Sequence, residues 1–483
     1  MDYKAVLWYV GVMLLLLSSL MVVSGIIALV MPGDDSAESL FFAAFLTLIV
    51  GLFPLMFVKC GNHKMTSKEG NFIVVVLWLT ACLFGAFPFL FYGGPFSVVN
   101  SLFESVSGFT TTGASILEDV ESVPAGLQFW RISTAWVGGM GVVTLFSMLV
   151  VRGMDQSVLY GAELSSVATR TVQEKKASFA KQMLVTYITL TLVTFFSLKL
   201  SGMRWFDSAV NAMSTCSTCG FSTRSDSIGA WNNPAAEWIL IFAMLAAGIN
   251  FVYVFLTFVK GSHRNVFKSE ISRTFLSLVG IAVLIIFIDL VVNGAPFGFG
   301  TLRKAAFQVV SLSTTTGFAT ADTTGWPYLC MGVLLVCSIV CGCSGSTSGG
   351  IKVDRLVLAV KGLVRNIMDI LHPGVVVSVK VDGQIKSDKQ VSDAYAYFFI
   401  YFMLLIVFAI VNIIMGMDAT SGFTASVACI GNVGPGFGEI GSMSNYAHLP
   451  AAVKFSNMFE MILGRLEIYP IVSLLASFRR ASS

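Results

Sequence analysis

Apolar residues are grouped along the chain in long blocks that alternate with short polar segments. Several blocks contain no charged residue and are long enough to cross the core of a bilayer, which takes about 20 residues of α-helix. The clearest of them are Ala5–Val30, Leu40–Val58, Phe72–Tyr92 and Phe398–Met415. Inside a membrane, an α-helix satisfies its backbone hydrogen bonds within its own segment. The pattern therefore predicts an all-α protein that crosses the membrane several times.

A second class of apolar segment is too short to cross the membrane and ends in small residues. The four segments are Val98–Thr111, Phe206–Ser217, Leu302–Ser313 and Thr420–Ile430. Apolar stretches of about 10–14 residues are typical of re-entrant helices, and each of these begins near a residue type that caps helix N-termini. The expected caps are Ser97, Asp207, Thr301 and Asp418. Because a longer apolar segment lies on each side, the sequence predicts a unit of helix, half-helix, loop and helix that occurs four times.

The loops that follow the four short segments are similar to one another. They read FTTTG, CSTCG, STTTG and IGNVG, and their glycines recur about every 100 residues, which indicates an internal repeat. A polar residue precedes each of the first three glycines by nine positions. These polar residues are Glu104, Asn211 and Gln308. The fourth unit differs, because it has Ala425 at this position and Gly431, Asn432 and Val433 in its loop.

Non-helical backbone inside a bilayer is tolerated only where it is buried in protein or lines water. Four such loops around one axis would offer carbonyl oxygens that can replace the hydration shell of a cation. Glycine gives access to positive φ, and the C-terminal ends of the short helices add roughly half a negative charge each. The expected cation filter consists of Thr111, Thr112, Gly113, Thr218, Cys219, Gly220, Thr315, Thr316, Gly317, Asn432, Val433 and Gly434. Helix packing through small residues, the alternative, explains one or two such strings but not four at similar spacing.

Composition and charge support the membrane assignment and give an orientation. The chain of 483 residues is 55% hydrophobic and 12% charged, whereas a soluble protein has about 25% charged residues. Lys and Arg gather in alternate loops, and loops rich in these residues face the cytoplasm. The cationic groups lie at 59–68, 152–181, 260–268, 352–389 and 479–480. We expect both termini to be cytoplasmic and the first apolar block to be a retained helix, not a cleaved signal peptide.

The nine cysteines lie mostly in or beside apolar segments and do not suggest the disulfide framework of a secreted protein. Two pairs are close in sequence: Cys216 and Cys219 have two residues between them, and Cys341 and Cys343 have one. No histidine is near either pair in sequence, whereas zinc normally takes four nitrogen or sulfur ligands. We favour thiols that pack as small hydrophobes or line a pore wall over a metal site.

Two features of the apolar segments need a buried polar environment. The segment CGCSGSTSGGIKVDR, from Cys341 to Arg355, interrupts the helix after the third loop, and its glycines and hydroxyls cannot form a lipid-facing helix. A helix break that serves only packing is the alternative. Arg465 lies in the last apolar segment, where a charge normally faces a cavity or a partner. The alternative is an arginine whose side chain extends to the cytoplasm. Glu467, two residues on, is expected to face elsewhere.

The four loops and their short helices resemble the Trk/Ktr/HKT superfamily of potassium transporters over essentially the whole chain. The strings that carry the resemblance are TTTGAS, TCGFST, TTTGFAT and NVGPGFG. Two additional N-terminal helices make the chain most similar to the Trk-type bacterial membrane subunit. The resemblance implies K⁺ uptake across the cytoplasmic (inner) membrane, with K⁺ as the transported ion and no organic cofactor. In this family, glycine in all four filter positions goes with K⁺ preference, and serine in the first goes with Na⁺ permeation.

The resemblance also implies an organisation, a gate and partners. It divides the chain into two N-terminal helices at 1–70 and repeats at 71–153, 179–262, 267–371 and 390–483. A mobile intramembrane loop and an arginine below the filter would obstruct the pore. The residues concerned are Gly342, Gly345, Ser346, Thr347, Gly349, Gly350, Lys352 and Arg465. Two copies would form a homodimer, and the basic loops would dock a cytosolic nucleotide-binding regulatory ring. No nucleic acid is expected as a partner.

Other functions stay open at this point. A K⁺-binding subunit of an ATP-driven pump would share the filter, although such subunits are longer by resemblance. The string from Gly342 to Gly345 matches the G-x-S-G of intramembrane serine proteases, but a nucleophilic serine needs a base, and the four histidines are at loop or helix-edge positions. No P-loop is present, so we do not expect the chain to hydrolyse ATP itself. We expect a transporter and not an enzyme. Passive conduction and symport with H⁺ or Na⁺ are both compatible with the sequence.

Overall fold

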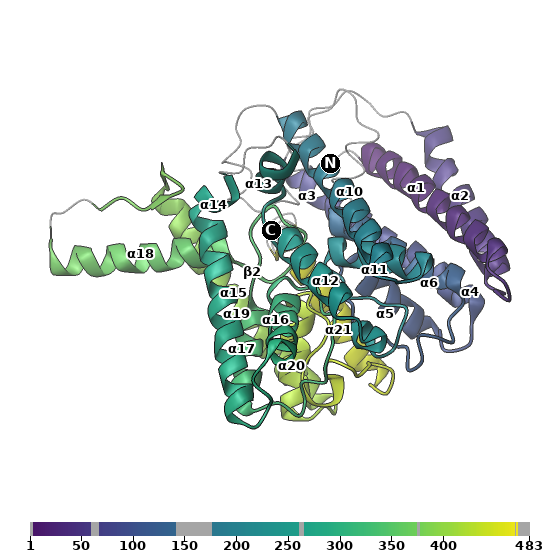
Figure 1. Cartoon of the computed structure of the whole chain (residues 1–483). Coiled ribbons are helices and arrows are strands. Elements are labelled where there is room, and N and C mark those ends of the chain that lie inside the picture. Colours follow the sequence, from purple (N-terminus) through teal and green to yellow (C-terminus); the bar gives the residue numbers. More distant parts are fainter. Residues whose placement is uncertain are drawn as a thin grey trace.

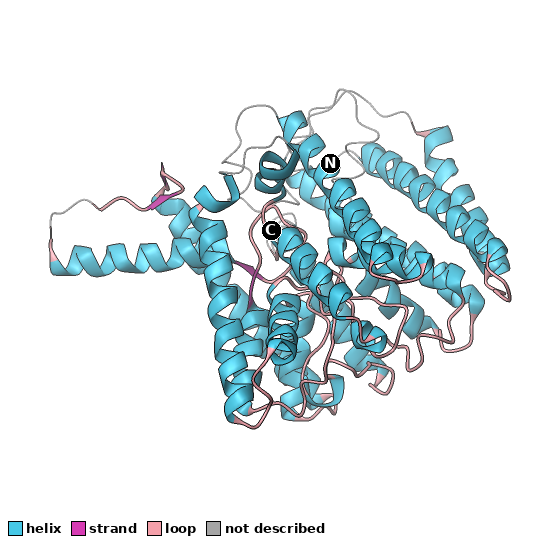
Figure 2. Cartoon of the chain, in the orientation of Figure 1, coloured by secondary structure: helices cyan, strands magenta, loops and turns pink. Residues whose placement is uncertain are grey.

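The computed structural model describes residues 3–58, 67–141, 176–259, 265–373, 377–468 and 470–471. These ranges are built almost entirely of helices (Figure 2). Six spans within them are long and apolar enough to cross a membrane, or seven if one bent helix pair is counted. The six are formed by α1 (Tyr3–Val30), α2 (Ala37–Phe57), α3 (Ser67–Gly85) with α4 (Phe87–Tyr92), α10 (Lys176–Leu200), α15 (Glu270–Val292) and α19 (Asp388–Ile414). The long apolar blocks of the sequence therefore form helices with nearly the predicted bounds.

Helices α1 and α2 form an antiparallel pair at the edge of the molecule (Figure 1). Glycines bring them close together, since a side-chain carbon added to Gly11 would lie 2.7 Å from the carbonyl oxygen of Gly51. Ser18 donates a hydrogen bond of 2.8 Å to the carbonyl of Ala44. Small residues and hydroxyls of this kind hold membrane helices together, because lipid tails give helices no hydrophobic reason to associate.

The four short helices are present where the sequence predicted them. They are α5 (Val98–Phe109), α11 (Trp205–Ser217), α16 (Phe299–Ser313) and α20 (Ala419–Ile430). Each is followed by a loop and then by a further helix. The further helices are α6 (Ala125–Met140), α12 (Pro234–Gly248), α17 (Tyr328–Ile339) and α21 (Ala451–Arg465).

Two of the four predicted N-caps are correct. The Ser97 hydroxyl accepts from Asn100 N, and the Asp418 carboxylate accepts from Thr420 N at 2.9 Å. The other two predictions are wrong, because α11 begins after Arg204 and α16 begins after Gly298. The predicted cap of α11, Asp207, accepts from the Thr223 hydroxyl at 2.6 Å, and that of α16, Thr301, donates to the carbonyl of Pro296 at 2.7 Å. Both therefore lie in the first helical turn and fasten it to a loop.

A proline starts each helix that follows a loop. Pro124, Pro327 and Pro450 are the N-cap residues of α6, α17 and α21, and Pro234 is the first residue of α12 after the cap Asn233. Proline fits these positions because it lacks the N–H that a first helical turn leaves unpaired, and because its φ is already fixed near the helical value. The helix that follows each of the four loops therefore begins at or directly after a proline.

Short elements connect the larger ones. The bent pair consists of α12 and α13 (Phe251–Val254), which continues as the π-helical turn η2 (Phe255–Val259), and the bend is 116°. Strands β1 (Val340–Cys341) and β2 (Ile351–Lys352) are parallel neighbours, and α18 (Val353–Leu371) extends to one side of the bundle (Figure 1). The remaining short elements are η1 (Ser227–Trp231), α14 (Asn265–Lys268), β3 (Lys380–Val381), β4 (Gln384–Ile385) and η3 (Gly438–Ile440).

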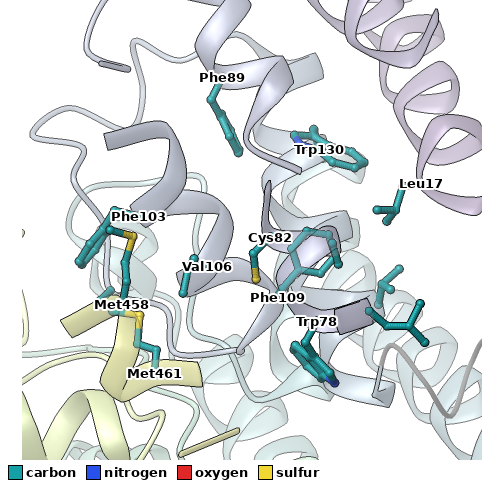
Figure 3. Packing of buried hydrophobic residues seen from close by; sticks show 14 of the residues in the cluster. Leu17, Trp78, Cys82, Phe89, Phe103, Val106, Phe109, Trp130, Met458 and Met461 are labelled. Atoms are coloured by element: carbon teal, nitrogen blue, oxygen red, sulfur yellow. The ribbon is translucent and has the colours of Figure 1, made fainter. Parts of the chain in front are cut away.

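A continuous apolar core joins the first short helix to the last helix (Figure 3). Phe103 and Phe109 of α5 are fully buried, and Met461 of α21 belongs to the same cluster. The indole N–H of Trp130 donates to the carbonyl of Gly85 at 3.0 Å and so fixes α6 against the end of α3. This packing gives the loop after α5 a rigid support.

Candidate functional site

The four short helices end in the same way. After α5, the N–H of Thr111 binds the carbonyl of Gly108 at 2.8 Å, and the N–H of Thr112 binds that of Ser107 at 2.9 Å, which is a Schellman motif. The same two bonds recur after α11, α16 and α20. The residue at the turn has positive φ each time: 55° at Thr111, 54° at Thr218, 56° at Thr315 and 51° at Asn432. Three β-branched residues in this disfavoured region point to a backbone that is shaped for function.

The glycines two residues later close the four loops into a ring. Their φ values are 79°, 85°, 80° and 95° at Gly113, Gly220, Gly317 and Gly434. A side-chain carbon on Gly113 would lie 1.7 Å from the carbonyl oxygen of Cys219, and the same contact is 2.1 Å from Gly220 to Thr316. A side-chain carbon on Gly317 would lie 2.3 Å from the carbonyl oxygen of Val433. One on Gly434 would lie 2.4 Å from that of Thr112, in the first loop. Each glycine thus abuts the carbonyl of the next loop, so the four loops surround one axis.

Side chains of the loops are engaged within the protein. The hydroxyls of Thr110 and Thr112 are 2.8 Å apart, as are those of Thr314 and Thr316. The amide of Asn432 donates to the Thr112 hydroxyl at 3.0 Å and to the carbonyl of Met461 at 2.9 Å. Asparagine in the fourth loop therefore joins that loop both to the first loop and to α21. Because these side chains bond one another, the main chain is left to supply the oxygens of the ring.

Cavities lie on both sides of the ring. All four ring glycines line the first cavity, together with the segments after the loops, such as Ser115 and Tyr446. The second cavity is lined by Gly345–Gly350, Lys352 and Arg465. A path through the ring would therefore lead from the first cavity to the segment that interrupts the third unit.

We call residues 341–352 the intramembrane loop, and strands β1 and β2 pair at its base. The bent pair α12–α13 supports it. The N–H of Cys343 donates to the carbonyl of Gly248 at 2.8 Å, and the carbonyl of Gly345 accepts from the N–H of Phe251 at 3.0 Å. The amide of Asn250 donates to the carbonyl of Ser344 at 2.7 Å. This support was not predicted, although the Gly248-Ile249-Asn250 string interrupts an apolar segment of the sequence.

The tip of the intramembrane loop touches the ends of the short helices. The Thr347 hydroxyl donates to the carbonyl of Cys216 at 3.0 Å, and the N–H of Gly349 donates to the Thr315 hydroxyl at 2.8 Å. A side-chain carbon on Gly349 would lie 2.3 Å from the carbonyl oxygen of Gly431. Glycine is required at Gly345 and Gly350 as well, where φ is 80° and 63°. The tip therefore lies directly against the second, third and fourth units.

Arg465 is the last residue of α21, and its side chain stays inside the protein. One guanidinium nitrogen donates to the carbonyl of Thr347 at 2.9 Å. The other donates to the carbonyls of Gly138 at 2.5 Å and Gly139 at 3.1 Å, on α6. Because its guanidinium donates to three carbonyls inside the protein, the Arg465 side chain does not extend to the cytoplasm, which was the alternative. Arg465 therefore ties the tip of the intramembrane loop to the first unit.

Other charged residues surround the base of the intramembrane loop. Lys352 is buried and donates to the carbonyl of Ser348. Arg355 forms an ion pair of 2.5 Å with Glu467 and lies 3.8 Å from the ring centre of Tyr397. Glu467 follows the end of α21 and lines the same cavity as Arg465, so the expectation that it faces elsewhere on the helix is wrong. The positive charges of Arg465 and Lys352 line the same cavity.

Comparison with known proteins identifies the family. A family profile described as TrkH, cation transport protein, matches residues 37–479. This chain belongs to the TrkH family. The Trk system potassium uptake protein TrkH of Salmonella typhimurium is 32% identical to it over 98% of both chains, and TrkG of Escherichia coli K12 is 31% identical over 87% of both. The crystal structure of the potassium transporter TrkH from Vibrio parahaemolyticus matches with a TM-score of 0.87 at 30% identity, covering 98% of this chain and 99% of that one.

Membership of the TrkH family decides the fold class and excludes the protease interpretation. The all-α polytopic fold is confirmed, and the protein is a transporter, not an enzyme. The described histidines, His372 and His448, are exposed and lie outside the intramembrane loop, whereas His63 and His263 lie outside the described residues.

The eight cysteines of the described part are free and buried, and no group of three or more potential metal ligands from His, Cys, Asp and Glu occurs there. Cys60 lies outside it.

The three polar residues that precede the glycines have different surroundings in this TrkH-family chain. Glu104 forms a buried ion pair with Arg131 and accepts from the N–H of Ile116 at 3.1 Å. Arg131 also donates to the carbonyl of Ser222 at 3.2 Å, so the pair fastens the segments after the first and second loops together. Gln308 donates to the carbonyl of Ala321 at 2.9 Å. The amide of Asn211 is buried without a partner in the described ranges. Sequence reasoning missed Arg131, whose signal was a charge within an apolar segment.

Proposed function

We propose that this protein takes up K⁺ across the cytoplasmic membrane through one pore, and that the ring of four loops is its selectivity filter. The observation that carries the proposal is the cyclic contact of each ring glycine with a carbonyl of the next loop. A ring of carbonyl oxygens can replace the hydration shell of a cation. The relatives named above are potassium uptake proteins, and this supports K⁺ as the ion. We also place the protein in the inner membrane on this ground.

The filter residues have distinct roles in this proposal. The carbonyls of Thr112, Cys219, Thr316 and Val433 form one layer of oxygen ligands, because these are the carbonyls that face the neighbouring glycines. The turn residues before them shape the backbone through positive φ. The C-terminal ends of α5, α11, α16 and α20 add partial negative charge near the axis, which favours a cation there. Glycine at all four ring positions supports K⁺ preference by resemblance to the superfamily.

We further propose that the intramembrane loop and Arg465 form the gate. The loop occupies the cavity on one side of the ring, and its tip bonds the short helices of two units. The charges of Arg465 and Lys352 raise the electrostatic energy of a cation in this cavity. Conduction then requires the loop to leave the axis, and its four glycines give it backbone freedom.

Organisation and partners are part of the same proposal. The four units correspond to 71–153, 179–262, 267–371 and 390–483, with both termini in the cytoplasm. A homodimer and a cytosolic nucleotide-binding ring are proposed by resemblance. The basic loops proposed to dock the ring are 152–181 and 352–389. Residues 152–175 and 374–376 of these loops lie outside the described residues, as do the cations at 59–64, 260, 264 and 479–480. We favour K⁺ uptake by this protein over a role as the K⁺-binding subunit of an ATP-driven pump. The reason is that the relatives it matches over nearly their full length are potassium uptake proteins.

Flux into vesicles tests the proposal. Purified protein in proteoliposomes should carry K⁺ and Rb⁺ faster than Na⁺ down a gradient. Repeating the measurement with and without a proton gradient separates channel conduction from symport, and we expect conduction because the ring contains no carboxylate. Vesicles in which the protein carries no K⁺ in either condition would contradict the proposed function.

A further inference from the structure

A buried polar cluster lies between α19, α20 and α21, outside the ring. Asn412 of α19 donates to the carboxylate of Glu460 on α21 at 3.1 Å and to the hydroxyl of Ser426 on α20 at 3.2 Å. Asn457 and Glu460 are three residues apart on α21, so they share one helix face. The exposed fraction of both side chains is 0%. A carboxyl group is therefore held inside the membrane region among amides and hydroxyls.

Several polar atoms in this cluster have no hydrogen-bond partner within the described ranges. They are one carboxylate oxygen of Glu460 (Oε2), the amide oxygen of Asn412 and both amide atoms of Asn457. Buried polar atoms are normally bonded to protein or to ordered water, because leaving them unpaired is costly. These unpartnered atoms of α19 and α21 lie near the carboxyl group of Glu460, and they indicate a binding site for small polar ligands.

No cation faces Glu460 from the described elements packed against it. The titratable groups that face it are Tyr401 on α19, Cys429 on α20 and Tyr446 before α21. The cations on its own helix are engaged elsewhere: Lys454 donates to the carbonyl of Ala447 at 2.7 Å, and Arg465 to that of Thr347. A buried carboxylate without a cation is strongly disfavoured, and a proton is the simplest ligand that removes the charge.

We propose that Glu460, Asn457 and Asn412 form an internal site that binds one proton and ordered water. The proton is transferred from hydronium in the adjoining water: one O–H bond of hydronium breaks, an O–H bond forms at Oε2 of Glu460, and a neutral water molecule is left. The neutral carboxyl then donates a hydrogen bond, for which the unpartnered amide oxygens of Asn412 and Asn457 are acceptors, directly or through water. The site thereby stays uncharged between three helices at neutral pH.

The site also adjoins the fourth loop. Met461, the residue after Glu460, accepts from Asn432 at 2.9 Å, and Ser426 belongs to the short helix that carries this loop. A negative charge on Glu460 would disturb both supports, so we infer that K⁺ flux falls when the proton is lost at alkaline pH. This consequence depends on the proposed function, whereas proton binding itself does not.

Infrared difference spectroscopy tests proton binding without relying on transport. The full chain in lipid vesicles should give the C=O band of a protonated, buried carboxyl at neutral pH. Glu460→Gln should remove the band, Glu460→Asp should shift it, and Glu38→Gln, at an exposed position on α2, should leave it unchanged. A wild-type spectrum without this band, or a band that persists in folded Glu460→Gln, would overturn the proposal. The wild-type spectrum decides even if the glutamine variant does not fold.

Flux measurements test the link to the fourth loop. We expect wild-type K⁺ flux to fall at least about tenfold once the buried carboxyl loses its proton, because an unpaired buried charge strongly destabilises its surroundings. Glu460→Gln should keep wild-type flux at neutral pH and lose the alkaline fall. An unchanged alkaline fall in this variant, with the infrared band lost, would overturn the link while leaving the proton site in place. Absence of K⁺ flux in every variant would instead count against the proposed function.

Discussion

The guanidinium of Arg465 donates to the main-chain carbonyl of Thr347 at 2.9 Å, so the last residue of α21 holds the tip of the intramembrane loop. The same side chain bonds Gly138 of α6 at 2.5 Å. Glycine at Gly138 also lets α6 approach the end of α5, since a side-chain carbon there would lie 1.8 Å from the carbonyl oxygen of Phe109. The end of α6 is therefore part of the arginine's binding site.

Arg465→Ala should increase K⁺ flux through proteoliposomes. The substitution removes a positive charge and the hydrogen bonds that hold the loop, and hydrogen bonds to charged groups contribute about 1.5–3 kcal/mol each. Loss of one such bond shifts a closed–open equilibrium by about tenfold or more. Arg465→Lys keeps the charge but not the planar fork, so its flux should lie between the two. Equal flux in all three proteins would contradict the gate.

Deletion of Ser346–Ser348 should leave the pore leaky. These residues include Thr347, which bonds both Cys216 and Arg465, so the shortened loop cannot reach the second unit. Basal ⁸⁶Rb⁺ efflux from loaded vesicles measures the leak. As a control, deletion of Gly383 in the turn between β3 and β4 alters a loop outside the pore and should leave efflux at the wild-type level. A folded loop deletion that stays tight would argue against an obstructing role.

Gly113→Ser should lower the preference for K⁺ over Na⁺. A side-chain carbon there would lie 1.7 Å from the carbonyl oxygen of Cys219, so the ring must change shape to accept it. Gly94→Ser is the matched control, since φ is also positive at Gly94 but no atom lies within 4 Å of the added carbon. The ratio of K⁺ to Na⁺ flux should fall only in the ring variant. A parallel fall in both would indicate general backbone strain.

Arg131→Met should strongly destabilise the protein. Removing one partner of a buried ion pair leaves the charge of Glu104 unpaired, which costs about 3–5 kcal/mol. The double variant Glu104→Gln with Arg131→Met should recover part of this loss, because no buried charge remains. Arg224→Met breaks a half-exposed pair with Glu121 and should cost less than about 1 kcal/mol. Thermal unfolding in detergent measures the wild type, Arg224→Met, and the cycle variants Arg131→Met, Glu104→Gln and the double variant. Full additivity in the cycle would contradict coupling between Glu104 and Arg131.

Local sequence patterns predicted much of the fold. The four short helices occur within three residues of their predicted ends, because apolar length and small terminal residues act locally. Two predicted N-caps were wrong, because α11 and α16 begin earlier and Asp207 and Thr301 bond loop atoms from inside the first helical turn. The residue types that favour an N-cap did not show where these two helices begin.

The site was predictable only in part for a similar reason. Repeated spacing located the loop residues, and glycine content located the intramembrane loop. Which residues fasten these loops depends on contacts between distant segments, such as Asn432 with Thr112 and Asn250 with Ser344. Arg131 and Glu460 were overlooked because their environment depends on the fold. Arg131 pairs with Glu104 of another helix, whereas the two cations of α21 bond other groups and leave Glu460 without a cation.

The location of a bound ion tests the central claim most directly. Crystals of this protein grown in Rb⁺ and measured at the rubidium absorption edge should give anomalous peaks on the axis of the ring. We expect the strongest peak within coordination distance of the carbonyl oxygens of Thr112, Cys219, Thr316 and Val433, and its loss when Rb⁺ is replaced by Na⁺. Rubidium peaks that lie only outside the ring, or four loops that do not meet around an axis, would contradict the account.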